Sequence, residues 1–354
     1  MSIFSSNNNF LGVDIGSSSI KLVELKRQAG KLRLLTYSFT ENIETVTKKD
    51  WHKDASYTAR LINKMCQKAG TSSRNAVAAL PTFSVFSSII NLPNISKKEV
   101  FSAVHWEAKK VIPLPLEEMV LDWKIIDDKN NKTTEDGKKK QPNTRVLLTG
   151  APKTLVEKYI KIFKEAHINL LSLETETFSL IRSLLGNDKS TVMIVEIGTS
   201  TTDVSIVTNS IPILSRSIDV GGETITEAIS HNLDIGKERA EQFKYDLGIT
   251  STDSKEDVVP KTIASSIDPI VNEIKYMLNL FQDKHNTTVE KIILSGGSSL
   301  LPNLVNYLEK VLNKDVIIGD AWSRISYPTE LKSTLDEVGP KLAVSIGLAM
   351  REME

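Results

Sequence analysis

The stretch that decides the fold is Leu11-Gly12-Val13-Asp14-Ile15-Gly16-Ser17-Ser18-Ser19-Ile20-Lys21-Leu22-Val23-Glu24-Leu25. Apolar residues flank Gly16-Ser17-Ser18 on both sides, which predicts strands over 10–15 and 19–26 joined by a tight turn. A third strand is expected over 31–39. Gly16 lets a ligand approach the backbone, and the turn amides with three serine hydroxyls can bind an anion.

Two charged side chains flank this turn. Asp14, at the end of the first strand, is suited to a hydrated Mg²⁺ that rides on phosphates. Lys21 falls on a strand face from which its ammonium can reach phosphate oxygens. The hairpin therefore has the residue types of a phosphate-binding loop.

The same pattern recurs 182 residues later, where Glu196-Ile197-Gly198-Thr199-Ser200-Thr201 follows one apolar strand and precedes another. A repeat at half the chain length indicates two similar lobes, since a solenoid repeats every 20–50 residues or so. The second copy offers threonine hydroxyls and has Glu196 as its acid. Two structural hairpins without a ligand remain the alternative interpretation.

A third element is a strand that runs into a double glycine, Ile292-Ile293-Leu294-Ser295-Gly296-Gly297-Ser298-Ser299. Such a turn lets a flat ring such as adenine lie against bare backbone. Taken alone, this pattern favours an ordinary turn between a strand and a helix.

Composition excludes several classes of protein. The 354 residues include 44 Lys+Arg and 44 Asp+Glu, so the formal net charge is 0, which argues against a nucleic-acid partner. One cysteine, Cys66, excludes an internal disulfide, and the five histidines form no zinc motif. With no long apolar run, no signal-peptide pattern and an acidic C-terminus, we expect a cytoplasmic protein that does not insert into a membrane.

The order of predicted elements suggests a first lobe over 1–186 and a second over 187–354. Within the first lobe, 83–151 is expected to form an extra subdomain. Its expected parts are a helix near 96–112, strands over 119–126 and 145–151, a flexible tip over 128–144, and a core holding Phe101, Trp106 and Trp123. The last helix of the chain is expected to begin at Pro340 and end near Arg351.

Two phosphate hairpins followed by a strand-Gly-Gly-helix element resemble the actin/Hsp70/hexokinase superfamily. Within it the chain looks most like the PilM family of type IV pilus assembly, which is related to the division protein FtsA. The matching stretches are residues 11–25, Ile218-Asp219-Val220-Gly221-Gly222-Glu223-Thr224-Ile225-Thr226, and Ile346-Gly347-Leu348-Ala349-Met350-Arg351. The resemblance implies an α/β, actin-like two-lobed ATPase fold of duplicated RNase H-like domains, with an FtsA/PilM-type α+β subdomain in the first lobe.

The resemblance also implies a site for ATP and Mg²⁺. Asp14 and Glu196 would hold the metal, and the extra methylene of Glu196, about 1.5 Å, would weaken metal placement or hydrolysis more than nucleotide binding. The implied nucleotide contacts are Gly16, Ser17, Ser18, Ser19 and Lys21 in the first loop, Gly198, Thr199, Ser200 and Thr201 in the second, and Gly222, Glu241, Lys244, Gly296 and Gly297 around the ribose and base.

Hydrolysis in an actin-like site needs a polar residue that orients water in the link between the lobes. Here that link offers Glu174 and Glu176, and Glu176 is the candidate catalytic residue. A carboxylate at this position also suits a helix N-terminus, so a purely structural role stays open. At most a weak ATPase is expected.

The function implied by the resemblance is that of an ATP-binding scaffold at the inner face of the inner membrane. It would dock the cytoplasmic N-terminal tail of a PilN-like inner-membrane protein as an extended peptide. Other pilus platform components, motor ATPases and self-association are further possible contacts. The alternatives are a small-metabolite kinase of the same superfamily and an FtsA-like filament-forming protein.

Overall fold

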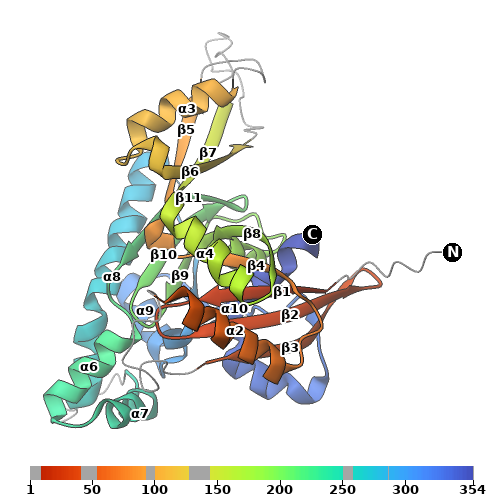
Figure 1. Ribbon diagram of the computed structural model, residues 1–354. Helices are drawn as coiled ribbons and strands as arrows, with labels where there is room; N and C mark the ends of the chain where they lie inside the picture. Colours follow the sequence, from red (N-terminus) through yellow and green to blue (C-terminus); the bar gives the residue numbers. More distant parts are fainter. Residues whose placement is uncertain are drawn as a thin grey trace. The chain divides into compact units, whose positions relative to one another are not determined.

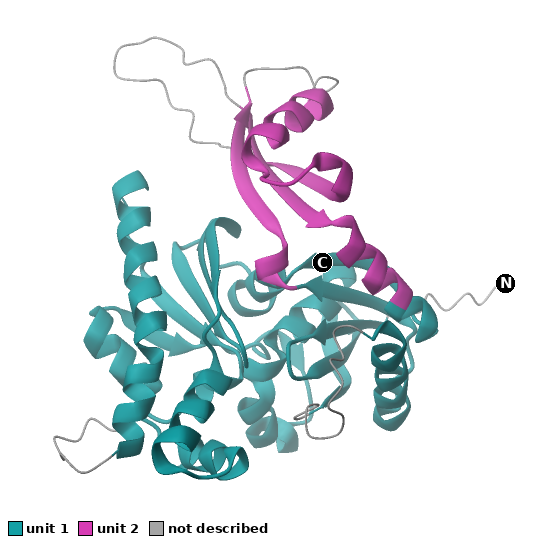
Figure 2. Cartoon of the chain, turned by 60° about the vertical axis from the view of Figure 1, so that its left-hand side comes forward, with its two compact units in different colours: residues 1–80, 162–354 teal, residues 81–161 magenta. Residues whose placement is uncertain are grey.

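The computed structural model describes residues 9–40, 54–92, 100–126, 144–249, 258–285 and 287–353. The chain divides into two compact units, one made of residues 1–80 and 162–354 and the other of residues 81–161 (Figure 2). The expected tip over 128–144 and the start of the helix expected near 96–112 fall almost wholly outside the described residues.

The first unit contains two mixed sheets (Figure 1). The first sheet has the order β14-β3-β2-β1-β4-β8, and the second has the order β11-β10-β9-β12-β13. The strands of the first are β1 (Asn9–Ile15), β2 (Ile20–Gln28), β3 (Lys31–Phe39), β4 (Asn75–Leu80), β8 (Asn169–Thr175) and β14 (Ile325–Ser326). Those of the second are β9 (Val192–Ile197), β10 (Thr202–Thr208), β11 (Ile211–Ile218), β12 (Lys291–Ser295) and β13 (Asp315–Ile318).

The two sheets repeat one pattern of pairing. In each, a three-stranded antiparallel meander comes first, and its first strand then pairs in parallel with the next strand of the sheet. A parallel partner requires a crossover, and helices supply the crossovers here. The duplicated α/β fold expected from the repeated hairpin is thereby confirmed.

Helices connect the strands of these sheets, and α2 (Ala55–Ala69) has caps at both ends that its sequence provides. In α2, the Asp54 side chain accepts a hydrogen bond from the Tyr57 amide, and Gly70 ends the helix with φ 64°. The helices among the described residues are α2 (Ala55–Ala69), α3 (Val100–Val111), α4 (Lys153–Glu165), α5 (Glu176–Leu180), α6 (Gly222–Leu233), α7 (Lys237–Leu247), α8 (Val258–His285), α9 (Leu304–Leu312) and α10 (Lys332–Met350). A π-helical turn, η3 (Ile181–Leu185), continues α5, and short 3₁₀ turns cover Thr82–Ser84, Leu116–Glu118, Gly297–Leu300, Thr329–Leu331 and Arg351–Met353.

After β13 the chain returns to the first sheet. Strand β14 pairs with β3, and α10 packs against β1 and β2. A Cβ on Gly12 would lie 1.9 Å from the carbonyl oxygen of Ser345, so the backbones of β1 and α10 meet directly. This arrangement departs from the predicted division at residue 187, because the last 30 or so residues pack with the first lobe's sheet. The sequence repeat marks the hairpins and carries no signal for this return.

The second unit is an α+β layer. Strands β5 (Phe86–Leu92), β7 (Thr144–Pro152) and β6 (Met119–Ile126) form an antiparallel sheet in the order β5-β7-β6. Helix α3 buries Val100, Val104 and Ala108 in the core of this unit. Trp123 packs against that core as expected, but Phe101 and Trp106 are 68% and 66% exposed, because they lie on the opposite face of α3.

Candidate functional site

The first hairpin closes as its sequence predicts. The Gly16 amide donates to the Ser19 carbonyl oxygen at 3.0 Å, and Asp14 pairs with Lys21 across the strands. The Lys21 Nζ atom lies 2.9 Å from Oδ2 of Asp14. The other carboxylate oxygen of Asp14, Oδ1, is buried and has no hydrogen-bond partner. A buried carboxylate oxygen with spare acceptor capacity suits the hydration shell of a bound cation.

The second hairpin has the same geometry. The Gly198 amide donates to the Thr201 carbonyl oxygen at 2.9 Å. The carbonyls of Gly198 and Thr199 accept from the amides of Gly222 and Glu223 at 2.9 and 2.8 Å. The second loop is thus fixed to the N-terminus of α6, where helix amides and the helix dipole favour an anion.

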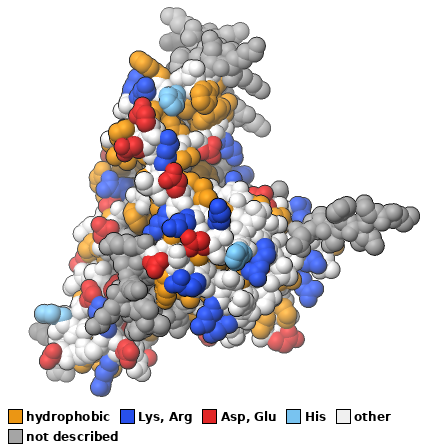
Figure 3. Space-filling model, in the orientation of Figure 1, with side chains coloured by type: hydrophobic (Ala, Val, Ile, Leu, Met, Phe, Trp, Pro, Cys, Tyr) orange, Lys and Arg blue, Asp and Glu red, His pale blue; other side chains and the backbone are white. Residues whose placement is uncertain are grey.

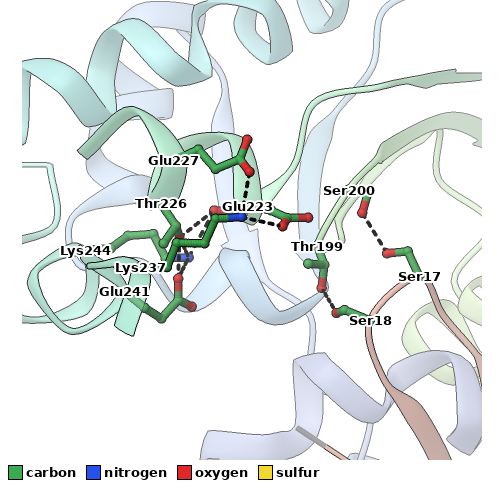
Figure 4. Close-up of polar contacts among 11 residues, drawn as sticks. Ser17, Ser18, Thr199, Ser200, Glu223, Thr226, Glu227, Lys237, Glu241 and Lys244 are labelled. Atoms are coloured by element: carbon green, nitrogen blue, oxygen red, sulfur yellow. Dashed lines mark hydrogen bonds and ion pairs between the residues drawn. The ribbon is translucent and has the colours of Figure 1, made fainter. Parts of the chain in front are cut away.

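The two loops meet through their hydroxyl groups (Figure 4). Ser18 Oγ donates to Thr199 Oγ1 at 2.7 Å, and Ser200 Oγ donates to Ser17 Oγ at 3.0 Å. Residues about 180 positions apart in the chain therefore form one polar surface. The sequence predicts these four residues as phosphate ligands, and the structure brings them together.

Acidic side chains surround Lys21. Burial lowers the pKa of the Lys21 ammonium, but the carboxylates of Asp14, Glu196 and Glu176 raise it, and the net pKa lies above its ordinary value. Burial and the carboxylate of Asp203 raise the pKa of Glu196 to about 8, with Asp14 adding to the effect and Lys21 opposing it. Lys21 therefore stays cationic, whereas Glu196 holds a proton at neutral pH.

Asp203 is the residue of this site that the sequence reasoning missed. It pairs with Glu196 across β9 and β10, as Lys21 pairs with Asp14 across β1 and β2. The 182-residue offset that relates Asp14 to Glu196 also relates Lys21 to Asp203, so extending the repeat as far as Lys21 would have found it. The two hairpins thus differ in charge: one pairs an acid with a base, the other pairs two acids.

Because Glu196 lies beside Asp203, we expect the free energy of unfolding to depend on pH. The unfolded chain loses the Glu196 proton near pH 4.5, while the folded chain keeps it to about pH 8. Over that window the folded state binds more protons, so the free energy of unfolding should fall as pH rises. Glu196→Gln fixes a neutral side chain, so we expect its free energy of unfolding to rise relative to that of wild type as the pH is raised from about 5 to about 8. Urea unfolding across this pH range, with the exposed Glu330→Gln as control, tests it. Parallel pH profiles for wild type and Glu196→Gln would refute the assignment.

Glu241 and Lys244 do not both lie open to a ligand as the resemblance implies. The Lys244 ammonium is buried and donates to the Gly222 carbonyl oxygen at 3.1 Å, Thr226 Oγ1 at 2.9 Å and Glu241 Oε2 at 2.6 Å (Figure 4). Burial lowers its pKa. An ammonium has three donors, and all three are used in tying α6 to α7. Glu241, whose side chain is 43% exposed, keeps one carboxylate oxygen outside these bonds.

The double glycine is a point of close backbone approach. Gly296 has φ 84°, and a Cβ there would lie 2.3 Å from the Ile197 carbonyl oxygen. Gly297 lies beside the stem of Lys341 from α10, and its carbonyl oxygen accepts from the Tyr245 hydroxyl at 3.4 Å. A Cβ on Gly222 would lie 2.3 Å from Ser298 Oγ and 3.5 Å from Lys244 Nζ. Gly222, Lys244 and the double-glycine turn are therefore neighbours.

The two acids of the link have different surroundings. Both oxygens of Glu174 bind Arg182, at 2.7 and 3.0 Å, and Arg351 Nε lies 3.3 Å from Oε2. Its side chain is 8% exposed. Glu176 begins α5 and is close enough to Lys21 to raise its pKa. Of the two acids, Glu174 is held by two arginines, and Glu176 is the one near Lys21.

Among the described residues, no group of three or more His, Cys, Asp or Glu side chains is placed to hold a metal ion directly. In the same part of the chain, no helix combines the length and apolarity needed to cross a membrane.

Two sheets of this topology, joined at paired glycine hairpins, define an actin-like fold. The structure superposes on MreB 5 of Spiroplasma citri bound to AMPPNP with a TM-score of 0.55 at 13% identity, covering 98% of this chain and 97% of that one. The family model for type IV pilus assembly protein PilM matches residues 12–353, and the chain belongs to this family.

Other comparisons agree with this family. A PilM-PilN type IV pilus biogenesis complex gives a TM-score of 0.82 at 23% identity, covering 97% of this chain and 98% of that one. Cell division protein FtsA of Bacillus subtilis (strain 168) is 23% identical over 238 residues, which are 59% of this chain and 53% of FtsA. FtsA of Neisseria meningitidis is 25% identical over 230 residues, which are 58% of this chain and 54% of that FtsA. The chain thus spans about half the length of these two FtsA proteins.

Proposed function

We propose that the chain is an ATP-binding, actin-like scaffold of the type IV pilus assembly machinery. The observation that carries nucleotide binding is the joining of the two hydroxyl loops, at 2.7 Å between Ser18 and Thr199 and at 3.0 Å between Ser17 and Ser200. The loop amides and hydroxyls would bind the phosphates, with Lys21 neutralising their charge. Asp14 and Glu196 would orient the water shell of Mg²⁺, which supplies positive charge beside the phosphates.

The remaining predicted residues would contact the base and the ribose or orient the water for hydrolysis. Gly297 would leave bare backbone where a ring can approach, whereas Gly222 and Gly296 allow the close packing that shapes this turn. Glu241 would offer its unbonded oxygen to ribose hydroxyls. Lys244 would act by fixing Glu241 and the α6 terminus, since its own donors are occupied. Glu176 would orient water for slow hydrolysis.

The partner in this proposal is the cytoplasmic tail of a PilN-like inner-membrane protein, which would hold the chain at the membrane. Support comes from the family and from the fold shared with the PilM-PilN complex. Nucleotide between the two sheets would shift the population of lobe arrangements by its differential affinity for them. Tail affinity should then depend on nucleotide.

Calorimetry of Mg·ATP binding tests the nucleotide site. We expect binding on the order of micromolar Kd for wild type, and at least tenfold weaker binding for Asp14→Asn and Ser18→Ala, because each removes a group that faces the phosphates or their metal. The matched control is Asp336→Asn, which changes an exposed aspartate that pairs with Lys332 at the surface. Absence of ATP binding by folded wild-type protein would refute the site.

Further experiments test the coupling to the tail and the hydrolysis of ATP separately. A tail peptide titrated with and without ATP tests the coupling, and equal affinities would remove it while leaving the scaffold. Glu176→Gln should lower ADP release without weakening ATP binding, since Glu176 lies beside Lys21 and would orient water without binding the phosphates. Faster ADP release on addition of a small-metabolite acceptor would favour a kinase, and ATP-dependent sedimentation would favour a filament.

A further inference from the structure

The charge of the chain is unevenly distributed around α2. Residues 55–80 contain Arg60, Lys64, Lys68 and Arg74 and no acidic residue, although cations and anions balance over the whole chain. A run of this kind gives one face of the protein a positive potential.

The geometry of α2 concentrates these charges. Its buried side chains, which include Ile62, Met65 and Cys66, face the protein interior. The side chains that it exposes most are Arg60, Lys64, Gln67 and Lys68. Spacing of four residues places the three cations along one helical face, over about 12 Å. Within the described ranges, none of the three forms a hydrogen bond or ion pair. We call Arg60, Lys64 and Lys68 the α2 basic stripe.

Neighbouring segments extend the positive surface beyond the end of α2. The Asn169 amide donates to the Arg74 carbonyl oxygen at 2.7 Å, so the loop after α2 lies beside the segment that follows α4. Arg74 and Lys164, near the ends of these two helices, are both exposed, as is Glu165 beside Lys164. Figure 3 shows Lys and Arg side chains on this face of the molecule, with some Asp and Glu side chains among them.

The chemistry of the stripe indicates its partner. Binding energy at a protein–protein interface is concentrated in a few aromatic and Arg anchors, and Lys is depleted there. The exposed residues of α2 are one arginine, two lysines and a glutamine, with no aromatic side chain among them. Long cationic side chains without partners, in a straight row, fit a diffuse anionic surface that requires no particular register. We propose that the α2 basic stripe binds the anionic surface of a phospholipid bilayer by electrostatic attraction, without insertion.

This inference goes beyond the proposed function, because it depends neither on nucleotide nor on a tail peptide. If the tail also holds the chain, the two contacts act together, since tethering raises the local concentration of the stripe at the membrane. The stripe would then orient the protein on the bilayer.

Vesicle flotation of the full chain tests the proposal without ATP or peptide. The vesicles contain phosphatidylcholine alone, or with about a third phosphatidylglycerol. We expect binding to the anionic vesicles only, with loss of binding when KCl is raised from about 0.05 to 0.5 M, because salt screens such contacts. Each cation near an anionic surface contributes roughly fivefold, so Arg60→Gln/Lys64→Gln/Lys68→Gln should weaken binding about 100-fold.

The matched control is Lys275→Gln/Lys284→Gln/Lys310→Gln, which removes three exposed cations from α8 and α9 and changes net charge by the same amount. We expect this control to keep binding within about threefold of wild type, and circular dichroism verifies that both variants are folded. Equal loss in both variants would overturn the proposal, as would equal binding to neutral and anionic vesicles. Binding of a polyglutamate peptide to the stripe without vesicle binding would also overturn it, in favour of an acidic protein.

Discussion

Gly347→Ala is expected to destabilise the protein by about 3 kcal/mol, although alanine in a helix normally stabilises by about 1 kcal/mol relative to glycine. A Cβ on Gly347 would lie 2.0 Å from the Ser179 carbonyl oxygen and 2.6 Å from its carbonyl carbon. Both are backbone atoms of α5, so relief requires the two helices to move apart. Ser179 Oγ also donates to the Val344 carbonyl oxygen at 2.5 Å, and separation would stretch this bond.

Chemical unfolding of wild type, Gly347→Ala and Gly236→Ala measures the effect. Gly236 precedes α7, and a Cβ added to it would meet nothing within 4 Å beyond its chain neighbours. Replacing Gly236 should therefore change the free energy of unfolding by less than about 1 kcal/mol. If Gly347→Ala is as stable as this control, α5 and α10 do not pack through backbone contact.

The sequence predicts the repeated hairpins of this fold and the elements whose ends are marked by glycine or by a change in hydrophobic pattern. Both hairpins, the double-glycine turn and most helices follow from local pattern and caps, because their determinants lie within a few residues of one another. The resemblance then supplies the two-lobed arrangement. The meeting of Ser18 with Thr199 depends on how two distant hairpins pack, and only the duplicated motif made it predictable.

Other features depend on tertiary contacts that local pattern does not encode. The small and apolar residues near the C-terminus predict a last helix from about Pro340, but α10 starts at Lys332 and holds Pro340 in its interior. There the Pro340 carbonyl oxygen accepts from the Gly296 amide at 3.0 Å and from Ser295 Oγ at 3.2 Å. Likewise, the resemblance implies ligand contacts for Glu241 and Lys244, and only the tertiary structure shows that the lysine side chain is buried.

Glu174→Gln is expected to lower the free energy of unfolding by about 3 kcal/mol. The glutamate binds Arg182 through two hydrogen bonds, and side-chain exposure is 8% for Glu174 and 14% for Arg182. Arg182 also donates to the Gly347 carbonyl oxygen at 2.8 Å, so this ion pair ties the link to α10. Removing the negative charge leaves a buried guanidinium uncompensated, which is the costly half of breaking such a pair.

Thermal and urea unfolding of a double-mutant cycle tests this prediction. Arg182→Met should also destabilise, and Glu174→Gln/Arg182→Met should lose less than the sum of the single changes, since the second substitution removes the stranded charge. The control is Asp336→Asn, whose exposed pair with Lys332 should contribute less than about 1 kcal/mol. Additive effects in the cycle would show that the two side chains do not stabilise each other.

The same variant distinguishes the two acids of the link. Glu174 is held by Arg182 and Arg351, whereas Glu176 acts on Lys21 beside the hairpins. Glu174→Gln should therefore lower stability, while the ATP affinity of the folded protein stays within about threefold of wild type. Glu176→Gln should lower the rate of hydrolysis with little loss of stability. If Glu174→Gln instead lost hydrolysis and kept full stability, Glu174 would be the residue that orients water, and the assignment of that role to Glu176 would be wrong.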